Sequence, residues 1–106
     1  MNMIKFLLIA TAMAFGVTAH AADPAAGKEK SKVCAACHGE NGISQTADFP
    51  KLAGQYNDYL VRALNDYKLG VRKNPIMAGQ VANLKKEDIA DLAAYFSSQQ
   101  ALATKY

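Results

Sequence analysis

Two cysteines and a histidine lie together in one pentapeptide, Cys34-Ala35-Ala36-Cys37-His38. Two thiols three positions apart, followed at once by an imidazole, are the pattern of covalent haem attachment, in which each thiol adds to one vinyl group. On a helix, residues three apart share one face, so both sulfurs can reach the same cofactor. The adjacent imidazole is then the proximal iron ligand. The pentapeptide therefore predicts one haem c attached through Cys34 and Cys37, with His38 on the iron.

One methionine is available for the other face of the iron. The remaining histidine and methionines lie in an N-terminal segment that we expect to be removed: Met1, Met3, Met13 and His20. Met77 follows a proline and lies 39 residues after His38, enough chain to pass around a haem and return on its other side. A thioether opposite an imidazole raises the reduction potential. A second histidine ligand from the mature chain is excluded, and a lysine ligand remains formally open.

Two alternative interpretations of the cysteine pair are a thioredoxin-like redox pair and a zinc site. A redox pair of that type accompanies a strand that leads into a helix, and the sequence has no strand pattern. A structural zinc site needs four ligands, whereas the mature chain supplies only three from the usual cysteine and histidine set: Cys34, Cys37 and His38. Haem attachment fits the sequence better than either alternative.

Further residues are candidates for contacts around the haem. The Pro50 carbonyl, 12 residues after His38, is a candidate acceptor for the second ring N–H of this imidazole, a bond that would fix the ring orientation. We expect Leu52 to pack on the haem face. Four polar side chains are candidates for hydrogen-bonding or neutralising the haem propionates, with ordinary surface or core packing as the alternative for each: Tyr56, Tyr59, Arg72 and Lys73.

The N-terminus has the three-part pattern of a secretory signal. Lys5 precedes an apolar run over residues 6–17, and Ala19 and Ala21 are small residues at the positions that signal peptidase reads. The run is too short for a clear membrane span, and an uncleaved anchor is the alternative. We expect residues 1–21 to be the signal peptide and residues 22–106 to be one monohaem domain, for which the haem supplies missing core.

The charge balance is modest, with 12 Lys and Arg against 9 Asp and Glu, or +3. Removing Lys5 with the signal would lower this to +2 before the haem propionates are counted. The basic residues gather within 28–32, 68–73 and 85–86, where they could steer a redox partner or form ordinary solvated helix faces. No nucleic-acid-binding pattern is present.

The hydrophobic periodicity predicts helices and no strands. Asp23 and Pro24 mark the start of a helix that runs to Gly39, in which Gly27 would let another helix approach closely. Residues 39–54 are expected to form a loop, 55–69 a second helix ended by Gly70, and 71–78 an extended loop, since a residue before proline avoids helical geometry. A last helix over 86–100 carries an apolar stripe: Ile89, Leu92, Ala93 and Phe96, with Tyr95 beside it.

Taken in order, these motifs resemble class I cytochrome c. The segments that carry the resemblance are residues 34–39, 49–55, 75–77 and 89–96, and it covers essentially all of 23–100. The chain is most similar to the small bacterial periplasmic monohaem group and to one half of the related dihaem cytochromes. The resemblance implies an all-α cytochrome c fold of three to four helices wrapped around one covalently bound haem c. It also implies His38 and Met77 as axial ligands and the Pro50 carbonyl as partner of His38. From the residues themselves, Gly27 and Tyr95 are candidates for the contact between the first and last helices.

The expected function is that of a periplasmic electron carrier rather than an enzyme. Its partners would be redox proteins such as a terminal oxidase, a reductase, a dehydrogenase or a cytochrome bc1-type complex. We expect no nucleic acid partner, no stable membrane insertion after signal cleavage, and a monomer. The alternatives are a haem protein with an open sixth site, which would bind gases or react as a peroxidase, and an electron-transfer subunit of a larger oxidoreductase complex.

Overall fold

The computed structural model describes residues 21–100, so residues 1–20 of the expected signal peptide and the tail 101–106 lie outside the described residues. Within that range the chain forms five helices and no strand. The helices are α1 (Pro24–Lys30), α2 (Lys32–His38), α3 (Asn57–Leu69), α4 (Pro75–Val81) and α5 (Lys86–Ser98). None of these five helices has the length and apolar character that a membrane crossing requires.

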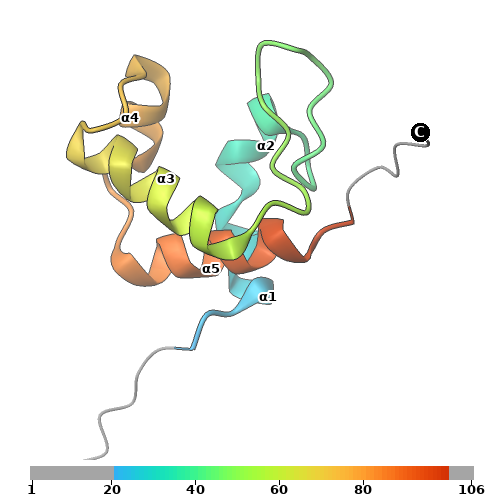
Figure 1. Ribbon diagram of the computed structural model, residues 1–106. Coiled ribbons are helices and arrows are strands. Elements are labelled where there is room, and N and C mark those ends of the chain that lie inside the picture. Colours follow the sequence, from blue (N-terminus) through green and yellow to red (C-terminus); the bar gives the residue numbers. More distant parts are fainter. Residues whose placement is uncertain (1–20, 101–106) are drawn as a thin grey trace, which may run out of the picture.

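The helices are arranged around α5. Both α1 and α3 pack on α5, α4 packs on α3, and α2 continues from α1 past α5 to stand on the same side as α4 (Figure 1). The apolar stripe expected on the last helix faces inward, and Leu92, Ala93 and Phe96 join Leu60 of α3 in the core. The prediction of an all-α fold is confirmed, with five helices in the described range where three or four were expected.

One additional helix arises from a break at Ser31. The sequence predicts one helix from Pro24 to Gly39, but α1 ends at Lys30 and α2 begins at Lys32. The buried Ser31 hydroxyl donates to the Lys28 carbonyl at 2.7 Å. This bond competes for the carbonyl that a continuous helix would use four residues later, and serine bonds of this kind bend helices.

The other additional helix is α4, which replaces part of the extended loop predicted over 71–78. That prediction was wrong from Pro75 onward. Asn74 is extended, as a residue before proline should be, with φ −154° and ψ 118°. It forms the N-cap of α4, and Pro75 occupies the first helical position, where its missing N–H is not needed. The same pairing of a capping residue with proline starts α1 at Asp23 and Pro24.

The contact between α1 and α5 depends on Gly27, which is buried. A Cβ atom at this position would lie 2.0 Å from the Asp91 carbonyl oxygen and 2.7 Å from the Cβ atom of Tyr95. The two backbones are therefore as close as a glycine allows, and the expected approach at Gly27 is confirmed. Since α2 follows α1 directly, this contact also places the cysteine motif relative to α5.

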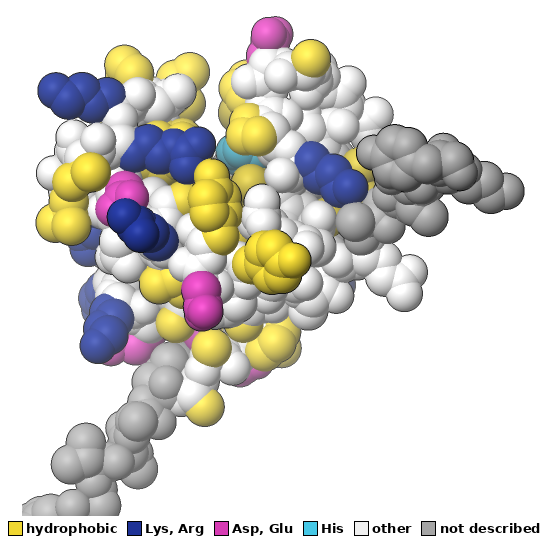
Figure 2. Space-filling view, viewed as in Figure 1, with side chains coloured by type: hydrophobic (Ala, Val, Ile, Leu, Met, Phe, Trp, Pro, Cys, Tyr) yellow, Lys and Arg dark blue, Asp and Glu magenta, His cyan; other side chains and the backbone are white. Residues whose placement is uncertain are grey.

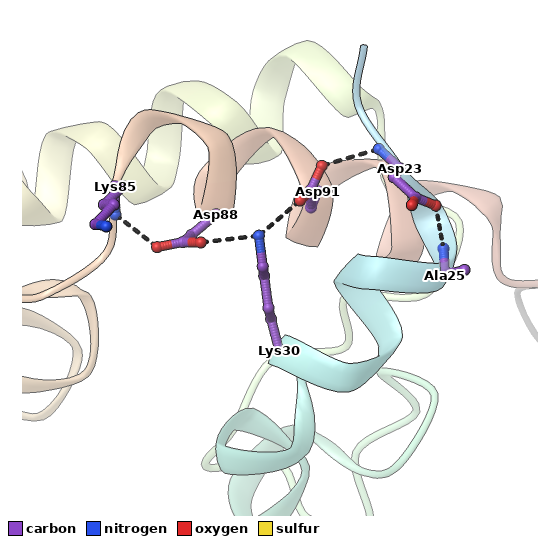
Figure 3. A network of polar contacts seen from close by, with 6 residues as sticks. All are labelled: Asp23, Ala25, Lys30, Lys85, Asp88 and Asp91. Carbon is purple, nitrogen blue, oxygen red and sulfur yellow. Dashed lines mark hydrogen bonds and ion pairs between the residues drawn. The ribbon is translucent and has the colours of Figure 1, made fainter. Parts of the chain in front are cut away.

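A polar network joins α1 to α5 beside Gly27 (Figure 3). The Lys30 ammonium lies 2.7 Å from one carboxylate oxygen of Asp91 and 2.8 Å from one of Asp88. Asp91 is fully buried, and its second carboxylate oxygen accepts a 2.9 Å bond from the Asp23 N–H. Asp88 also accepts from the Lys85 N–H at 2.8 Å, which closes the first turn of α5. Each carboxylate is therefore paired with both a cation and a backbone donor.

This network predicts how the stability of the protein varies with pH. The hydrogen bond from Lys30 lowers the pKa of Asp88 below its usual 3.8, and bonds to Asp88 and Asp91 raise the pKa of Lys30 to about 12. A lowered carboxyl pKa contributes stability that is complete above 3.8 and is lost as the pH falls through the folded-state value. A raised lysine pKa contributes stability that is complete below 10.5 and is lost as the pH rises through about 12.

We therefore expect the melting temperature of wild type to exceed that of Lys30→Met by a constant amount from about pH 5 to 10, with the difference shrinking at both extremes. Thermal unfolding followed by circular dichroism across this range measures it. Methionine preserves the length of the side chain while removing its charge. A difference that persists unchanged at about pH 2 would contradict the assignment of these pKa shifts.

Candidate functional site

The helix α2 brings both cysteines to one cavity. Cys34 and Cys37 are one turn apart near the end of α2, are each partly buried, and are not joined in a disulfide. Both line a cavity of about 390 Å³, together with His38. Gly39 ends the helix with a φ of 84°, a conformation that turns the chain away immediately after the histidine. The motif is thus presented to the cavity by a single helical turn.

His38 is held in place from two directions. Its side chain is buried, and Nδ1 lies 2.8 Å from the Pro50 carbonyl oxygen. Since a carbonyl can only accept, Nδ1 carries the proton and Nε2 remains available for a metal. The Phe49 ring meets the imidazole edge-on, with ring centroids 6.4 Å apart and an interplanar angle of 67°. The expected approach of the Pro50 carbonyl is present, and the contact with Phe49 adds a second restraint on ring orientation.

Met77 borders the same cavity from another helix. It lies in the first turn of α4 and is partly buried. In Figure 1, α4 and α2 stand apart above α3 and α5, and the surface is hollowed between α4 and the loop that follows α2 (Figure 2). A histidine side chain, coloured cyan, is visible in this hollow. The imidazole and the thioether therefore reach one cavity from separate elements.

The floor and the rim of the cavity differ in character. The floor is apolar and comes from the core faces of three elements: Leu52 of the loop, Leu60, Ala63 and Leu64 of α3, and Leu92, Ala93 and Phe96 of α5. At the rim, Arg72 donates to the Tyr59 hydroxyl at 3.1 Å, and its guanidinium lies 4.9 Å from the centre of the Tyr67 ring. This arrangement suits a flat apolar ligand that carries anionic groups at one edge.

The remaining candidates from the sequence are unevenly placed. Leu52, Tyr59 and Arg72 line the cavity. Tyr56 and Lys73 are not among its lining residues, and Tyr56 is 82% exposed. Sequence reasoning missed Phe49 and Asn74 as parts of the site. The available signals were the aromatic residue directly before Pro50 and the capping residue directly before a second proline.

The structure also bears on the alternative interpretations of the cysteine pair. Burial raises the pKa of the Cys34 thiol, and the neighbouring Cys37 adds to this effect. Thiols of redox pairs are tuned in the opposite direction, toward the thiolate. For the zinc alternative, residues 21–100 contain no group of three or more His, Cys, Asp and Glu side chains placed to hold a metal ion. Both observations favour the haem interpretation over the alternatives.

The residues around the cavity fit a haem c. They supply two thiols on one helical turn, an imidazole whose Nδ1 is engaged by the Pro50 carbonyl, a thioether on a second helix and an apolar floor. Each member of this set has a known place in haem binding: thiols in attachment, imidazole and thioether in iron ligation. Within the described residues, every buried side-chain nitrogen and oxygen has a hydrogen-bond partner. No buried polar group there requires a different metal or ligand.

Comparison with known proteins agrees with this assignment. The family model described as "Cytochrome c" matches residues 24–100. The chain is 48% identical to cytochrome c4 of Pseudomonas aeruginosa, covering 89% of this chain and 48% of the relative. It is 42% identical to cytochrome c-554(548) of Halomonas halodenitrificans, covering 76% of this chain and all of the relative.

A solved structure gives the same result. The crystal structure of reduced recombinant cytochrome c4 from Pseudomonas stutzeri is 45% identical and superposes with a TM-score of 0.72, over 76% of this chain and 47% of that one. The chain thus spans about half the length of the cytochrome c4 relatives that it matches. From the matched range and the cavity it contains, we conclude that this chain belongs to the cytochrome c family and carries one haem c bound covalently through Cys34 and Cys37.

Proposed function

We propose that the chain is a periplasmic electron carrier that passes single electrons between redox proteins and is exported by a signal peptide over residues 1–21. In this proposal His38 and Met77 are the two axial ligands of the haem. The supporting observation is that an imidazole and a thioether, carried by different helices, border one cavity. With both axial positions filled, no position remains on the iron for a substrate. The proposal therefore describes a carrier rather than an enzyme.

Bound haem supplies a one-electron couple between ferric and ferrous iron. The protein's own groups set the conditions for that couple. The Pro50 carbonyl holds the His38 ring in orientation and increases the basicity of Nε2, the nitrogen that would bind the iron. The Met77 thioether favours the ferrous state and so raises the potential. The apolar floor excludes water, and Arg72 and Tyr59 are placed at the rim to receive the negative charge of the propionates.

The proposed partners are redox proteins that dock weakly and briefly. Relatives whose names state a role support this class. The thiosulfate dehydrogenase electron acceptor of Stutzerimonas stutzeri is 38% identical, and the cytochrome subunit of sulfide dehydrogenase of Chlorobaculum tepidum is 33% identical. Apolar and basic side chains surround the hollow on the face shown in Figure 2. Such a mixed surface suits small transient electron-transfer interfaces.

The second candidate function is that of an electron-transfer subunit within a larger oxidoreductase complex. The sulfide dehydrogenase relative favours it, since this chain covers 89% of that protein. A diffusible carrier remains folded and monomeric when it is produced alone, and it still accepts electrons from a small reductant. A subunit is expected to aggregate or to lose its haem environment without its partner. Size-exclusion chromatography of the haem-loaded chain, before and after reduction, separates the two candidates.

The carrier proposal also predicts a specific electrochemical result. The haem-loaded protein should exchange one electron reversibly at an electrode, and it should consume neither oxygen nor hydrogen peroxide during repeated cycles, because both axial positions are filled. Protein-film voltammetry with and without added peroxide measures this. A catalytic wave that grows with peroxide concentration would support the open-site alternative in place of the carrier.

A further inference from the structure

We propose that Asn74 is a positioning residue for the iron ligand Met77. Its side-chain oxygen fixes the backbone of the ligand and so sets how firmly the thioether occupies the axial position. This inference rests on the proposed ligation by Met77. It extends that proposal to how the protein holds Met77 in its ligating position, a question that the cysteine motif and the pair of axial ligands do not answer.

The geometry of the cap carries the inference. Asn74 Oδ1 accepts hydrogen bonds from the N–H of Ile76 at 3.0 Å and from the N–H of Met77 at 3.1 Å. The second of these bonds ends on the ligand residue itself. Pro75, between Asn74 and Ile76, holds its own φ near the helical value. The backbone leading into Met77 is therefore restrained at each of three successive positions.

Few other contacts stabilise α4. The helix has seven residues, well below the length at which an isolated helix is stable in water. Only Val81, at its far end, is buried, and Ile76 is 58% exposed. Gly79 weakens the helix further, because glycine is a poor helix former. The cap therefore supplies a large share of what keeps the first turn of α4, and Met77 with it, in place.

This arrangement makes Met77 ligation an equilibrium that the cap controls. When the first turn of α4 unwinds, the thioether moves with its backbone and the axial position opens to a competing ligand. A substitution that stabilises α4 locally should therefore weaken the competing ligand, and one that destabilises α4 should strengthen it. Asn74 and Gly79 then provide two independent ways to shift one equilibrium, with opposite signs.

Exogenous imidazole measures this equilibrium directly. The ferric haem-loaded protein is titrated with imidazole at neutral pH while the long-wavelength absorption band of the iron–thioether bond is followed. We expect half-displacement in Asn74→Ala at an imidazole concentration about fivefold below that of wild type, the factor that one N-cap typically contributes. Asn74→Asp should restore the wild-type value, because a carboxylate caps equally well.

Gly79→Ala should shift the titration the other way. A Cβ atom at Gly79 meets nothing within 4 Å, and alanine is the better helix former. Half-displacement should then require about fourfold more imidazole than in wild type. This variant also keeps the proposal testable if Asn74→Ala fails to retain haem.

Asp23→Ala is the matched control. Asp23 caps α1, another seven-residue helix with proline at its first position, by accepting from the Ala25 N–H at 2.9 Å. Its loss should lower the melting temperature while leaving the imidazole titration unchanged. Equal displacement curves for wild type, Asn74→Ala and Gly79→Ala would overturn the inference. A Met77→Ala protein that retains the band would instead overturn the ligation on which it rests.

Discussion

Replacing Gly27 with alanine should lower the free energy of unfolding by about 3 kcal/mol or more, the upper range for overpacking a close contact. The added Cβ atom would lie 2.0 Å from the Asp91 carbonyl oxygen. That neighbour is backbone in the middle of α5 and cannot turn aside as a flexible side chain would. The helices α1 and α5 must therefore separate, and the salt bridge between Lys30 and Asp91 must lengthen with them.

Urea unfolding of the haem-loaded protein, followed by far-ultraviolet circular dichroism, measures this loss. Gly79→Ala makes the same chemical change in α4, where the new methyl group meets open space. It should stabilise the protein by up to about 1 kcal/mol. A loss below about 1 kcal/mol for Gly27→Ala would show that the contact between α1 and α5 yields easily, and close packing of the two helices would then no longer explain a glycine at this position.

Replacing Met77 with histidine should lower the reduction potential by on the order of 100 mV or more, since axial ligands set haem potentials over a wide range. A thioether favours ferrous iron, whereas a second imidazole stabilises the ferric state. The change keeps two axial ligands, so the haem should remain closed to carbon monoxide. The result would separate the effect of ligand type from that of an open site.

Potentiometric titration of the two proteins under identical conditions provides the measurement. Ile76→Ala is a suitable control, because Ile76 neighbours Met77 and lines the same cavity without a ligating atom. Its potential should stay close to that of wild type. If Met77→His and Ile76→Ala shift the potential equally, Met77 acts through cavity polarity and is not a ligand.

Much of this fold follows from local patterns in the chain. The apolar stripe at Ile89, Leu92, Ala93 and Phe96 faces the core as its spacing indicates. Asp23 before Pro24 starts α1, and Gly70 ends α3 with a φ of 75°. These features were predictable because each depends on interactions within a few residues of the chain, where propensity and capping rules apply.

The features that could not be predicted depend on contacts between distant segments or on one local signal overriding another. The sequence alone does not show that Asp91 is fully buried, and the approach of Lys30 and Asp23 from distant positions helps to make a buried carboxylate tolerable there. The helix α4 is hidden in the sequence because the extended preference of a residue before proline suggests a longer extended segment. In fact the preference ends at Asn74, whose extended backbone is what a helix cap requires.

The absorption spectrum of the haem-loaded protein, ferric and ferrous, with and without carbon monoxide, tests the central claim most directly. Ligation by His38 and Met77 predicts a weak long-wavelength band in the ferric protein that is absent in Met77→Ala. It also predicts that carbon monoxide leaves the ferrous wild-type spectrum unchanged while altering that of Met77→Ala. A wild-type protein that lacks the band and binds carbon monoxide readily would contradict this ligation, because its sixth iron position would be open.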